Sequence, residues 1–236
     1  MQLSIIISTR NRAKQLALAL SSVFTQSLSC NLYEVIVVDN GSIDETQQIV
    51  SEFSATHDNI VYAFQSVPGL HNCRHLGMRL AKADYLVFTD DDIQASPSWL
   101  ESLYCSFADH RAVIATGNIL PIYADNPPKW VDYLWTRNEW GMVLGHFSLL
   151  DFGTQRKEVP ADFVWGCNFA IQKELLLDVG GFHPDAMPYE LRRFRGDGET
   201  HVSNELNSRG ITALFHPQAL VHHYIGSERL TVDYLC

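Results

Sequence analysis

The chain has 236 residues, of which 46% are hydrophobic, and a formal net charge of −10 at pH 7. This length suits one large domain with a sizeable core, and the acidic balance excludes a sequence-independent grip on nucleic-acid phosphates. Five scattered cysteines without CxxC spacing indicate neither a zinc site nor a disulfide framework, and no apolar stretch could span a membrane. We therefore expect a cytoplasmic protein with at most peripheral contact at the inner face of a membrane. The sequence indicates no particular oligomeric state.

The first part of the chain alternates apolar strands with helices. Apolar runs predict strands at residues 3–8, 34–38, 60–65 and 85–89, and helical spacing of apolar residues predicts helices at 14–25, 44–54 and 70–82. Strands and helices that alternate at this pace, with right-handed crossovers, predict an α/β fold with a Rossmann-like, mostly parallel sheet flanked by helices.

The alternation becomes irregular after Asp92. We expect helices at residues 98–107, 173–179 and 200–208, and strands at 113–120, 212–216 and 220–223. An aromatic segment at 130–145 indicates either a surface that faces a substrate or simply part of the aromatic core. The sequence thus predicts a single domain over residues 1–236, with a regular half over about 1–121 and a smaller, irregular subregion over about 122–236.

Three consecutive aspartates follow the strand at residues 85–89. Asp90, Asp91 and Asp92 repel one another, so a positive group should lie beside them, and a divalent cation is the obvious candidate. The carboxyl ends of parallel strands are also where open α/β sheets bind ligands. The alternative is a solvated acidic turn or helix cap.

Other polar residues follow the neighbouring strands. Thr9 and Arg10 come after the first strand and Asp39 after the second, so all of them should meet the aspartates at one edge of the sheet. Asp39 could accept hydrogen bonds from a base or a ribose, or it could form an Asx turn instead. Arg74, early in its helix, could face a diphosphate or carry a solvated charge.

The order of these motifs resembles the family 2 glycosyltransferases. The segments that carry the resemblance are residues 4–11, 37–42, 68–74, 88–92, 166–171 and 179–182, and the resemblance extends over nearly the whole chain. The resemblance implies a GT-A fold of the nucleotide-diphospho-sugar transferase superfamily. It also implies that the first half binds the nucleotide sugar and that the second half binds the acceptor.

The resemblance implies roles in donor binding for residues at the sheet edge. The residues implied to bind the nucleotide sugar are Ser8, Thr9, Arg10, Asp39, Arg74, Asp90 and Asp91. The donor would be a UDP, dTDP or GDP sugar.

The aspartates also resemble a DxD motif that binds Mn²⁺ or Mg²⁺, with Asp92 as the favoured ligand and Asp91 as its competitor. Oxygen ligands suit both ions, so the sequence does not choose between them. Members of this fold also use a late histidine as a metal ligand, which here would be His222 or His223. Because neighbouring strand residues point to opposite faces, at most one of the two should serve.

The resemblance places the catalytic base at the start of a late helix. The family carries an acidic pair there, and this chain reads Asp197-Gly198-Glu199 instead. Glu199 is the expected base and Asp197 the second choice. The alternative is that both acids only begin a helix, where negative charge is favourable. His75 is a further departure, since the family often carries asparagine at this position.

The implied reaction is inverting, metal-dependent transfer of a sugar to a saccharide or lipid-linked acceptor, in polysaccharide or glycoconjugate biosynthesis. Residues expected at the acceptor site are Trp135, Trp140, Trp165 and Asn168, with residues 184–196 as a loop that closes over it.

Three other functions are compatible with parts of the sequence. A sugar nucleotidyltransferase normally needs a glycine-rich loop after the first strand, and the segment Ser8–Asn11 has no glycine. A phosphoacceptor signalling domain would need acids after the first strand, and none follows it. A non-catalytic nucleotide-sugar-binding relative remains as the third, because the region around Asp197 departs from the family pattern.

Overall fold

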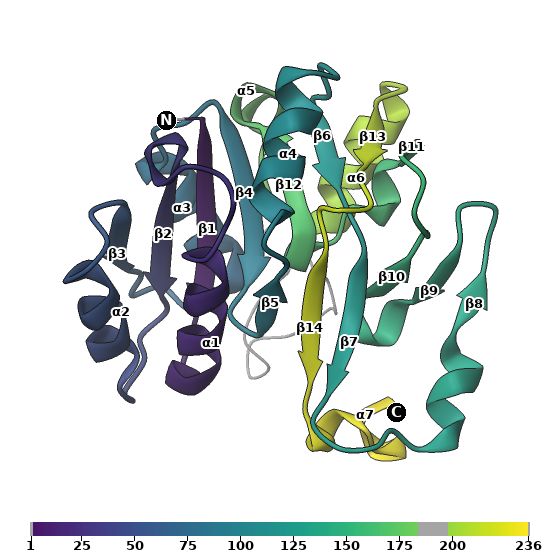
Figure 1. The fold of residues 1–236 in the computed structure, drawn as a ribbon, viewed down its shortest axis with the longest axis horizontal. Coiled ribbons are helices and arrows are strands. Elements are labelled where there is room, and N and C mark those ends of the chain that lie inside the picture. Colours follow the sequence, from purple (N-terminus) through teal and green to yellow (C-terminus); the bar gives the residue numbers. More distant parts are fainter. Residues whose placement is uncertain (1, 184–197, 236) are drawn as a thin grey trace.

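The fold is built on two sheets that lie side by side (Figure 1). A computed structural model describes residues 2–183 and 198–235. The larger sheet has eight strands in the order β11-β13-β6-β12-β4-β1-β2-β3, and the smaller has six in the order β5-β14-β7-β10-β9-β8. Within the described ranges, no helix combines the length and apolar character needed to cross a bilayer.

The strands of the larger sheet are β1 (Leu3–Thr9), β2 (Tyr33–Asp39), β3 (Ile60–Phe64), β4 (Tyr85–Asp90), β6 (Ile114–Thr116), β11 (Lys157–Pro160), β12 (Phe169–Gln172) and β13 (Thr212–Phe215). The neighbours β4-β1-β2-β3 are all parallel, as is the pair β6–β13. The pairs β4–β12, β6–β12 and β11–β13 are antiparallel. The predicted α/β class with a mostly parallel sheet is therefore confirmed.

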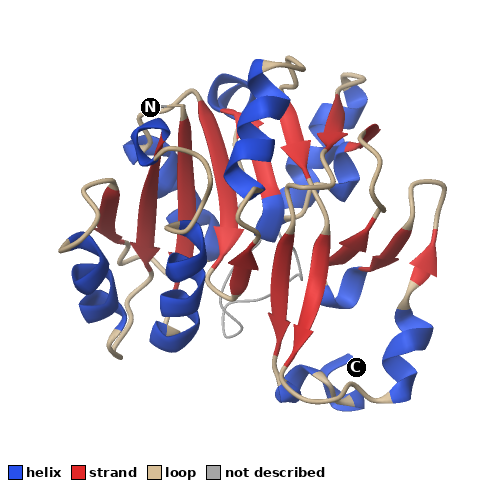
Figure 2. Ribbon diagram, in the orientation of Figure 1, coloured by secondary structure: helices blue, strands red, loops and turns tan. Residues whose placement is uncertain are grey.

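The helices are α1 (Ala13–Val23), α2 (Thr46–Ser54), α3 (Leu70–Leu80), α4 (Trp99–Ala108), α5 (Lys173–Asp178), α6 (Glu199–Ser208) and α7 (Val232–Leu235). Helices α1 to α6 lie in front of and behind the larger sheet, whereas α7 lies at the lower end of the smaller sheet (Figure 1 and Figure 2). β1 and β2 are runs of isoleucine and valine that this cover buries on both faces. Helix α3 can approach β1 closely because Gly77 has no side chain; a Cβ there would lie 2.4 Å from Ile6.

The smaller sheet was not expected from the sequence. Its strands are β5 (Ile93–Ala95), β7 (Ile119–Tyr123), β8 (Thr136–Arg137), β9 (Met142–Leu144), β10 (Leu149–Asp151) and β14 (Val221–Ile225). The single strand predicted at 113–120 was wrong, because the chain breaks at Gly117 into β6 and β7, which belong to different sheets. At this break the backbone passes under the carbonyl of Ala219, and a Cβ on Gly117 would lie 2.0 Å from that oxygen.

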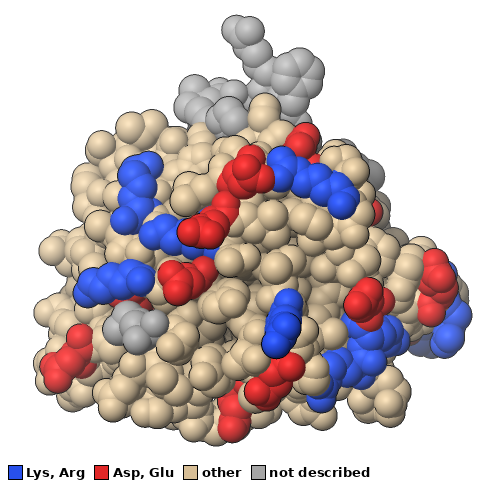
Figure 3. Space-filling view, turned by 90° about the horizontal axis from the view of Figure 1, so that it is seen from above, with Lys and Arg blue, Asp and Glu red and all other residues tan. Residues whose placement is uncertain are grey.

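Charged residues are intermixed on the face opposite the carboxyl ends of the parallel strands. Figure 3 views this face from above, and acidic and basic side chains lie next to one another across it. This face therefore presents no broad patch of a single sign.

Candidate active site

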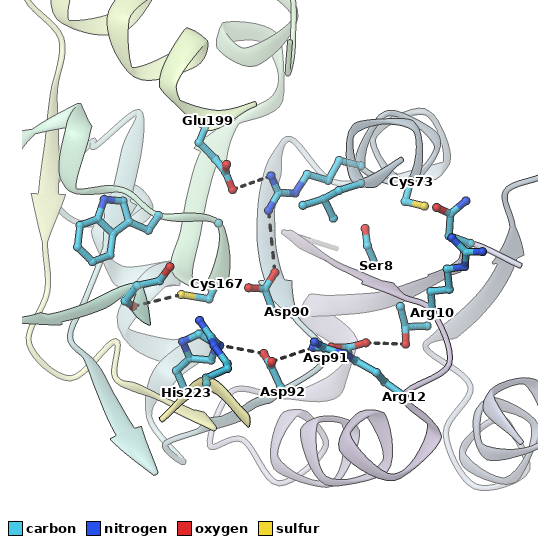
Figure 4. A pocket seen from close by; sticks show the side chains of 18 of the residues that line it. Ser8, Arg10, Arg12, Cys73, Asp90, Asp91, Asp92, Cys167, Glu199 and His223 are labelled. Carbon is cyan, nitrogen blue, oxygen red and sulfur yellow. Dashed lines mark hydrogen bonds and ion pairs between the residues drawn. The ribbon is translucent and has the colours of Figure 1, made fainter. Parts of the chain in front are cut away.

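A cavity of about 1050 Å³ opens at the carboxyl ends of β1 and β4 (Figure 4). Residues from both sheets line it, and they include Ser8, Thr9, Arg10, Arg74, Asp90, Asp91, Asp92, Trp165, Glu199 and His223. The sheet edge predicted from the sequence is thus where the structure gathers most of the candidate residues.

Asp90, Asp92 and His223 form a group whose ligand atoms all lie within 4.8 Å of one another. The pairing of β14 with β5 brings the histidine there, because His223 lies opposite Ile93 and the backbone N–H of Tyr224 donates to the carbonyl of Asp92 at 2.8 Å. Neighbouring His222 does not line the cavity.

The contacts of this trio fit a cation. The Nδ1 atom of His223 lies 2.9 Å from the carbonyl of Phe147, which can only accept, so Nδ1 carries a hydrogen and Nε2 faces Asp92. Nε2 lies 3.4 Å from Asp92 Oδ1, a buried oxygen without a hydrogen-bond partner. The space between them therefore suits a proton or a metal ion, and the nearby carboxylate of Asp90 favours the metal ion. One imidazole and two carboxylates are ligands that Mn²⁺ accepts readily.

Asp91 faces away from the trio. Its carboxylate accepts hydrogen bonds from Thr9 Oγ1 at 2.7 Å and from Arg12 Nη1 at 3.0 Å, so both of its oxygens are already bound by the protein. Arg12 Nη1 also donates to Asp92 Oδ2 at 2.8 Å, which leaves Asp92 Oδ1 directed at His223. Of the two aspartates that the sequence left as rivals, Asp92 therefore lies with Asp90 and His223.

Burial and mutual repulsion disturb the ionisation of these acids. Burial, and then the neighbouring Asp92, raise the pKa of Asp90. Burial raises the pKa of Asp91 to about 6, against the pull of Arg12. Burial acts on Asp92 in the same direction, but its contacts with His223 and the charge of Arg12 outweigh it and lower the pKa of Asp92. Three buried carboxylates so close together repel one another when charged. A divalent cation bound beside them would stabilise their charged forms.

An ion pair forms the opposite wall of the cavity. Arg74 Nη1 lies 2.6 Å from Glu199 Oε1, and Arg74 Nη2 lies 4.0 Å from Asp90. The backbone of Gly166 passes so close that a Cβ there would lie 1.9 Å from Glu199 Oε1 and 2.2 Å from Arg74 Nη2. With any other residue at this position, the two side chains of the pair would have to shift.

His75 supports this wall from behind. Its Nε2 accepts a hydrogen bond of 3.0 Å from the backbone N–H of Phe182, whose ring centre lies 5.0 Å from the guanidinium of Arg74. The histidine that departs from the family pattern thus fixes the residue on which Arg74 stacks.

Of the residues predicted to hold the nucleotide base, Thr9 and Arg10 line the cavity and Asp39 does not. Ser8 and Arg10 line it, and Ser8 Oγ is buried without a hydrogen-bond partner. Asp39 is 2% exposed and accepts hydrogen bonds of 2.8 Å from the Ser42 backbone and from the hydroxyl of Tyr62. Burial and Asp39 together raise the pKa of Tyr62 to about 12. The carboxylate of Asp39 is thus held rigidly behind the cavity wall.

The structure separates the four residues expected at the acceptor site. Trp165 lines the cavity. Trp135 and Trp140 do not, and Trp140 packs on Phe163 with 5.1 Å between ring centres. Asn168 is fully buried; its Oδ1 accepts from the indole of Trp99 at 2.9 Å and its Nδ2 donates to the carbonyl of Ala219 at 2.8 Å. Asp197 and residues 184–196 lie outside the described residues.

Sequence reasoning missed several residues of this cavity. Among them, Arg12 has the most direct contact with the acidic cluster, since it binds two of the three aspartates. Glu228, Arg229 and Tyr234 also line the cavity, although they follow the last motif of the chain. Arg12 lies 79 residues before Asp91 in the sequence, and no local pattern connects the two.

Comparison with known proteins bears on the family and the fold of the chain. The sequence profile described as "Glycosyl transferase family 2" matches residues 4–180. The chain is similar to chondroitin synthase from Escherichia coli, at 42% identity over 102 residues. It is also similar to validoxylamine A glucosyltransferase from Streptomyces hygroscopicus subsp. jinggangensis (strain 5008), at 28% identity over 203 residues.

These matches cover 42% and 78% of this chain but 15% and 47% of the two relatives, so the chain spans less than half of their length. Among solved structures, GalNAc-T7 with UDP, GalNAc and Mn²⁺ has the same fold. Its TM-score is 0.73 at 19% identity, over 95% of this chain and 44% of that one. Since the family profile covers well over half of the sequence, the chain belongs to glycosyl transferase family 2.

Proposed function

We propose that the chain transfers a sugar from a nucleoside-diphosphate sugar to an acceptor hydroxyl, with inversion at the anomeric carbon. The observation that carries this proposal is the convergence of Asp90, Asp92 and His223 with the Arg74–Glu199 pair in one cavity. Family membership supports the reaction class. The acceptor would be a saccharide or a lipid-linked sugar, as in polysaccharide or glycoconjugate synthesis.

The donor would lie along the cavity from the first strand to the aspartates. Ser8, Thr9 and Arg10 would hold the nucleoside end, with Asp39 fixing the loop behind them. Asp90, Asp92 and His223 would hold Mn²⁺ or Mg²⁺, which when bound supplies positive charge to the departing diphosphate. The similar structure with UDP and Mn²⁺ supports this arrangement.

The chain's own groups would carry out the proton transfer. Glu199, the first residue of α6, or Asp197, two residues earlier in the sequence, would take the proton of the acceptor hydroxyl. The acceptor oxygen would then form its bond to the anomeric carbon while the bond to the diphosphate oxygen breaks. Glu199 lies in the cavity wall, and Trp165 lies close enough to the same cavity to stack on an acceptor sugar.

Calorimetric titration with UDP, GDP, dTDP and CDP, each with and without Mn²⁺, tests the donor class. We expect one nucleotide to bind tightly, to need the metal ion, and to bind poorly to Asp92→Asn. Asp58→Asn, an exposed acid away from the cavity, is the matched control and should bind as wild type does. If none of the four nucleotides binds under either condition, the proposal is overturned.

A measurement of turnover in two variants identifies the catalytic base. Loss of the base should lower turnover by ~10²–10⁴ while nucleotide binding persists. Comparing Glu199→Gln with Asp197→Asn therefore assigns the role to one of them. If the wild type binds donor and neither hydrolyses nor transfers it, the chain is a nucleotide-sugar-binding relative. The configuration of the product, read by NMR, tests inversion.

A further inference from the structure

The chain after β14 turns back to the cavity. It forms a short 3-10 helix, η7 (Ser227–Arg229), and then α7, and three of its residues line the cavity wall: Glu228, Arg229 and Tyr234. None of these belongs to a motif of the sequence. Arg229 is half-buried beside the aspartate–histidine trio, with its Nη1 3.4 Å from His223 Nε2.

Two aromatic rings hold the side chain of Arg229. Its guanidinium carbon lies 5.6 Å from the ring centre of Phe147 and 5.4 Å from that of Tyr234. The two ring centres are 6.3 Å apart. Such contacts orient a guanidinium and attract its charge, but the ring faces do not accept hydrogen bonds from its in-plane N–H groups.

The protein meets the hydrogen-bonding needs of Arg229 only in part, through the long contact of 3.4 Å between Nη1 and His223 Nε2. Among residues 2–183 and 198–235, no carboxylate forms an ion pair with it within 4.0 Å, and its Nε is buried without a hydrogen-bond partner. Arg12 and Arg74 differ in this respect, since Arg12 binds Asp91 and Asp92 and Arg74 binds Glu199. Arg10, the fourth arginine of the cavity lining, is exposed to solvent, whereas Arg229 is half-buried. A cation held rigidly at a cavity wall, with a donor unsatisfied, is suited to an anionic ligand.

We propose that Arg229 binds the diphosphate of the donor, from the side of the cavity where β14 ends. This rests on the proposed function, because the trio next to Arg229 is where the diphosphate would lie. The planar fork of a guanidinium matches phosphate oxygens, and Arg229 would continue to hold the diphosphate as it leaves the sugar. Phe147 and Tyr234 are positioning residues that keep the fork aimed into the cavity.

Nucleotides that differ only in phosphate number test this assignment. The Mn²⁺-loaded protein is titrated with UDP, GDP, dTDP and CDP, and the tightest of these is then compared with its monophosphate. Loss of a charge-assisted contact should weaken diphosphate binding by about tenfold to a hundredfold in Arg229→Met. The monophosphate should lose less than about threefold, since it does not reach the arginine.

Three further variants make the result specific. Arg229→Lys keeps the charge without the fork and should recover part of the affinity. Tyr234→Leu leaves Arg229 in place without one of its rings and should weaken only the diphosphate. Arg137→Met, an exposed arginine of β8 outside the cavity lining, should bind both nucleotides as wild type does.

These titrations distinguish a failure of the Arg229 assignment from a failure of the proposed function. If wild type binds a nucleotide and Arg229→Met binds its diphosphate equally well, Arg229 does not contact the diphosphate, while the proposed function stands. Equal weakening of the monophosphate in a folded variant also overturns the assignment. If wild type binds none of the four nucleotides, the proposed function fails and the role of Arg229 fails with it. Should Arg229→Met not fold, Arg229→Lys and Tyr234→Leu decide in the same way.

Discussion

At the scale of single residues, the cavity depends on the absence of a side chain at Gly166. The Arg74–Glu199 pair fills the space that a Cβ would need. Since its backbone requires no left-handed conformation, glycine is present there for space and not for flexibility. This gives a physical reason for a glycine that the sequence alone showed only as part of a motif.

Gly166→Ala should therefore displace the ion pair and reduce the free energy of unfolding by about 1–3 kcal/mol. Urea unfolding measures this loss. In a double-mutant cycle with Glu199→Ala, the cost of the added methyl should shrink, because the nearest atom is gone. Gly145→Ala, where no atom lies within 4 Å, is the control and should leave stability unchanged. Fully additive costs would show that the pair does not restrict this position.

Arg12 orients two of the carboxylates in the aspartate cluster. It holds Asp92 Oδ2 and Asp91 Oδ1, which leaves Asp92 Oδ1 facing His223. Arg12→Met should weaken Mn²⁺ binding in the absence of nucleotide and cost about 1–3 kcal/mol of stability through the lost charged hydrogen bonds. Electron paramagnetic resonance of free Mn²⁺ measures the binding. Arg10→Met is the control, since Arg10 forms no ion pair with the aspartates; equal effects of the two variants would contradict this role.

The sequence predicted the residues of the site that follow strands, and missed those whose role is set by contacts distant in the chain. Asp90, Asp92 and Thr9 could be placed because the ends of parallel strands meet at one edge. Arg12 and Arg229 could not, since no local pattern distinguishes an arginine that binds across the fold from a solvated one. Trp135 and Trp140 were expected at the acceptor site because aromatic residues suit sugars, but aromatic residues also pack cores, and Trp140 packs on Phe163.

At the scale of elements, α3 couples the cavity to the segment after α5. His75 on α3 accepts the N–H of Phe182, and Phe182 packs on Phe88 of β4 with 4.9 Å between ring centres. This hydrogen bond requires an unprotonated Nε2. Burial, followed by the charges of His71 and Arg79, lowers the pKa of His75 from its ordinary value of 6.5.

Because the pKa of His75 is lower in the folded state, its contribution to stability is complete above pH 6.5 and is lost as the pH falls through the folded-state value. His75→Gln keeps an acceptor for Phe182 without a titrating group. Its unfolding midpoint in urea should therefore fall less than that of wild type between about pH 7.5 and about pH 5.5. Parallel curves for the two proteins would show that His75 does not titrate in this range.

The elements that the sequence missed are short. β8 has two residues and β5, β9 and β10 have three each, too few for an alternation of polar and apolar residues to be recognised. The long strands β1, β2 and β4 and the helices between them were predicted to within a few residues, because runs of isoleucine and valine and helical spacing are strong local signals. Which strands pair with one another is decided by contacts between residues distant in the sequence, and no local pattern contains these contacts.

At the scale of the whole molecule, the two sheets meet where the chain crosses from β6 to β7. Gly117 lies at this crossing, with its Cα under the carbonyls of Ala219 and His216. Buried side chains from both sheets, such as Ile114, Ile119 and Val221, belong to one continuous core. The sheets are therefore packed as one body in the described structure.

Gly117→Ala should disturb both sheets at once, because its Cβ would meet backbone atoms that cannot rotate away. We expect a loss of about 2–4 kcal/mol in the free energy of unfolding, with a single cooperative transition. Fluorescence and circular dichroism followed in the same urea titration measure it, with Gly145→Ala as the matched control. A loss below about 0.5 kcal/mol would show that the crossing has room to adjust.

The proposed metal ligands belong to different sheets: Asp90 ends β4 of the larger one, and His223 lies in β14 of the smaller. A cation held by this trio would tie the two sheets together, so that each sheet would supply part of the other's stability. By mass action, an ion present at a hundred times its dissociation constant would add about 2.7 kcal/mol to the folded state. The supply of this cation would then shift the balance between folded and unfolded protein as well as the turnover.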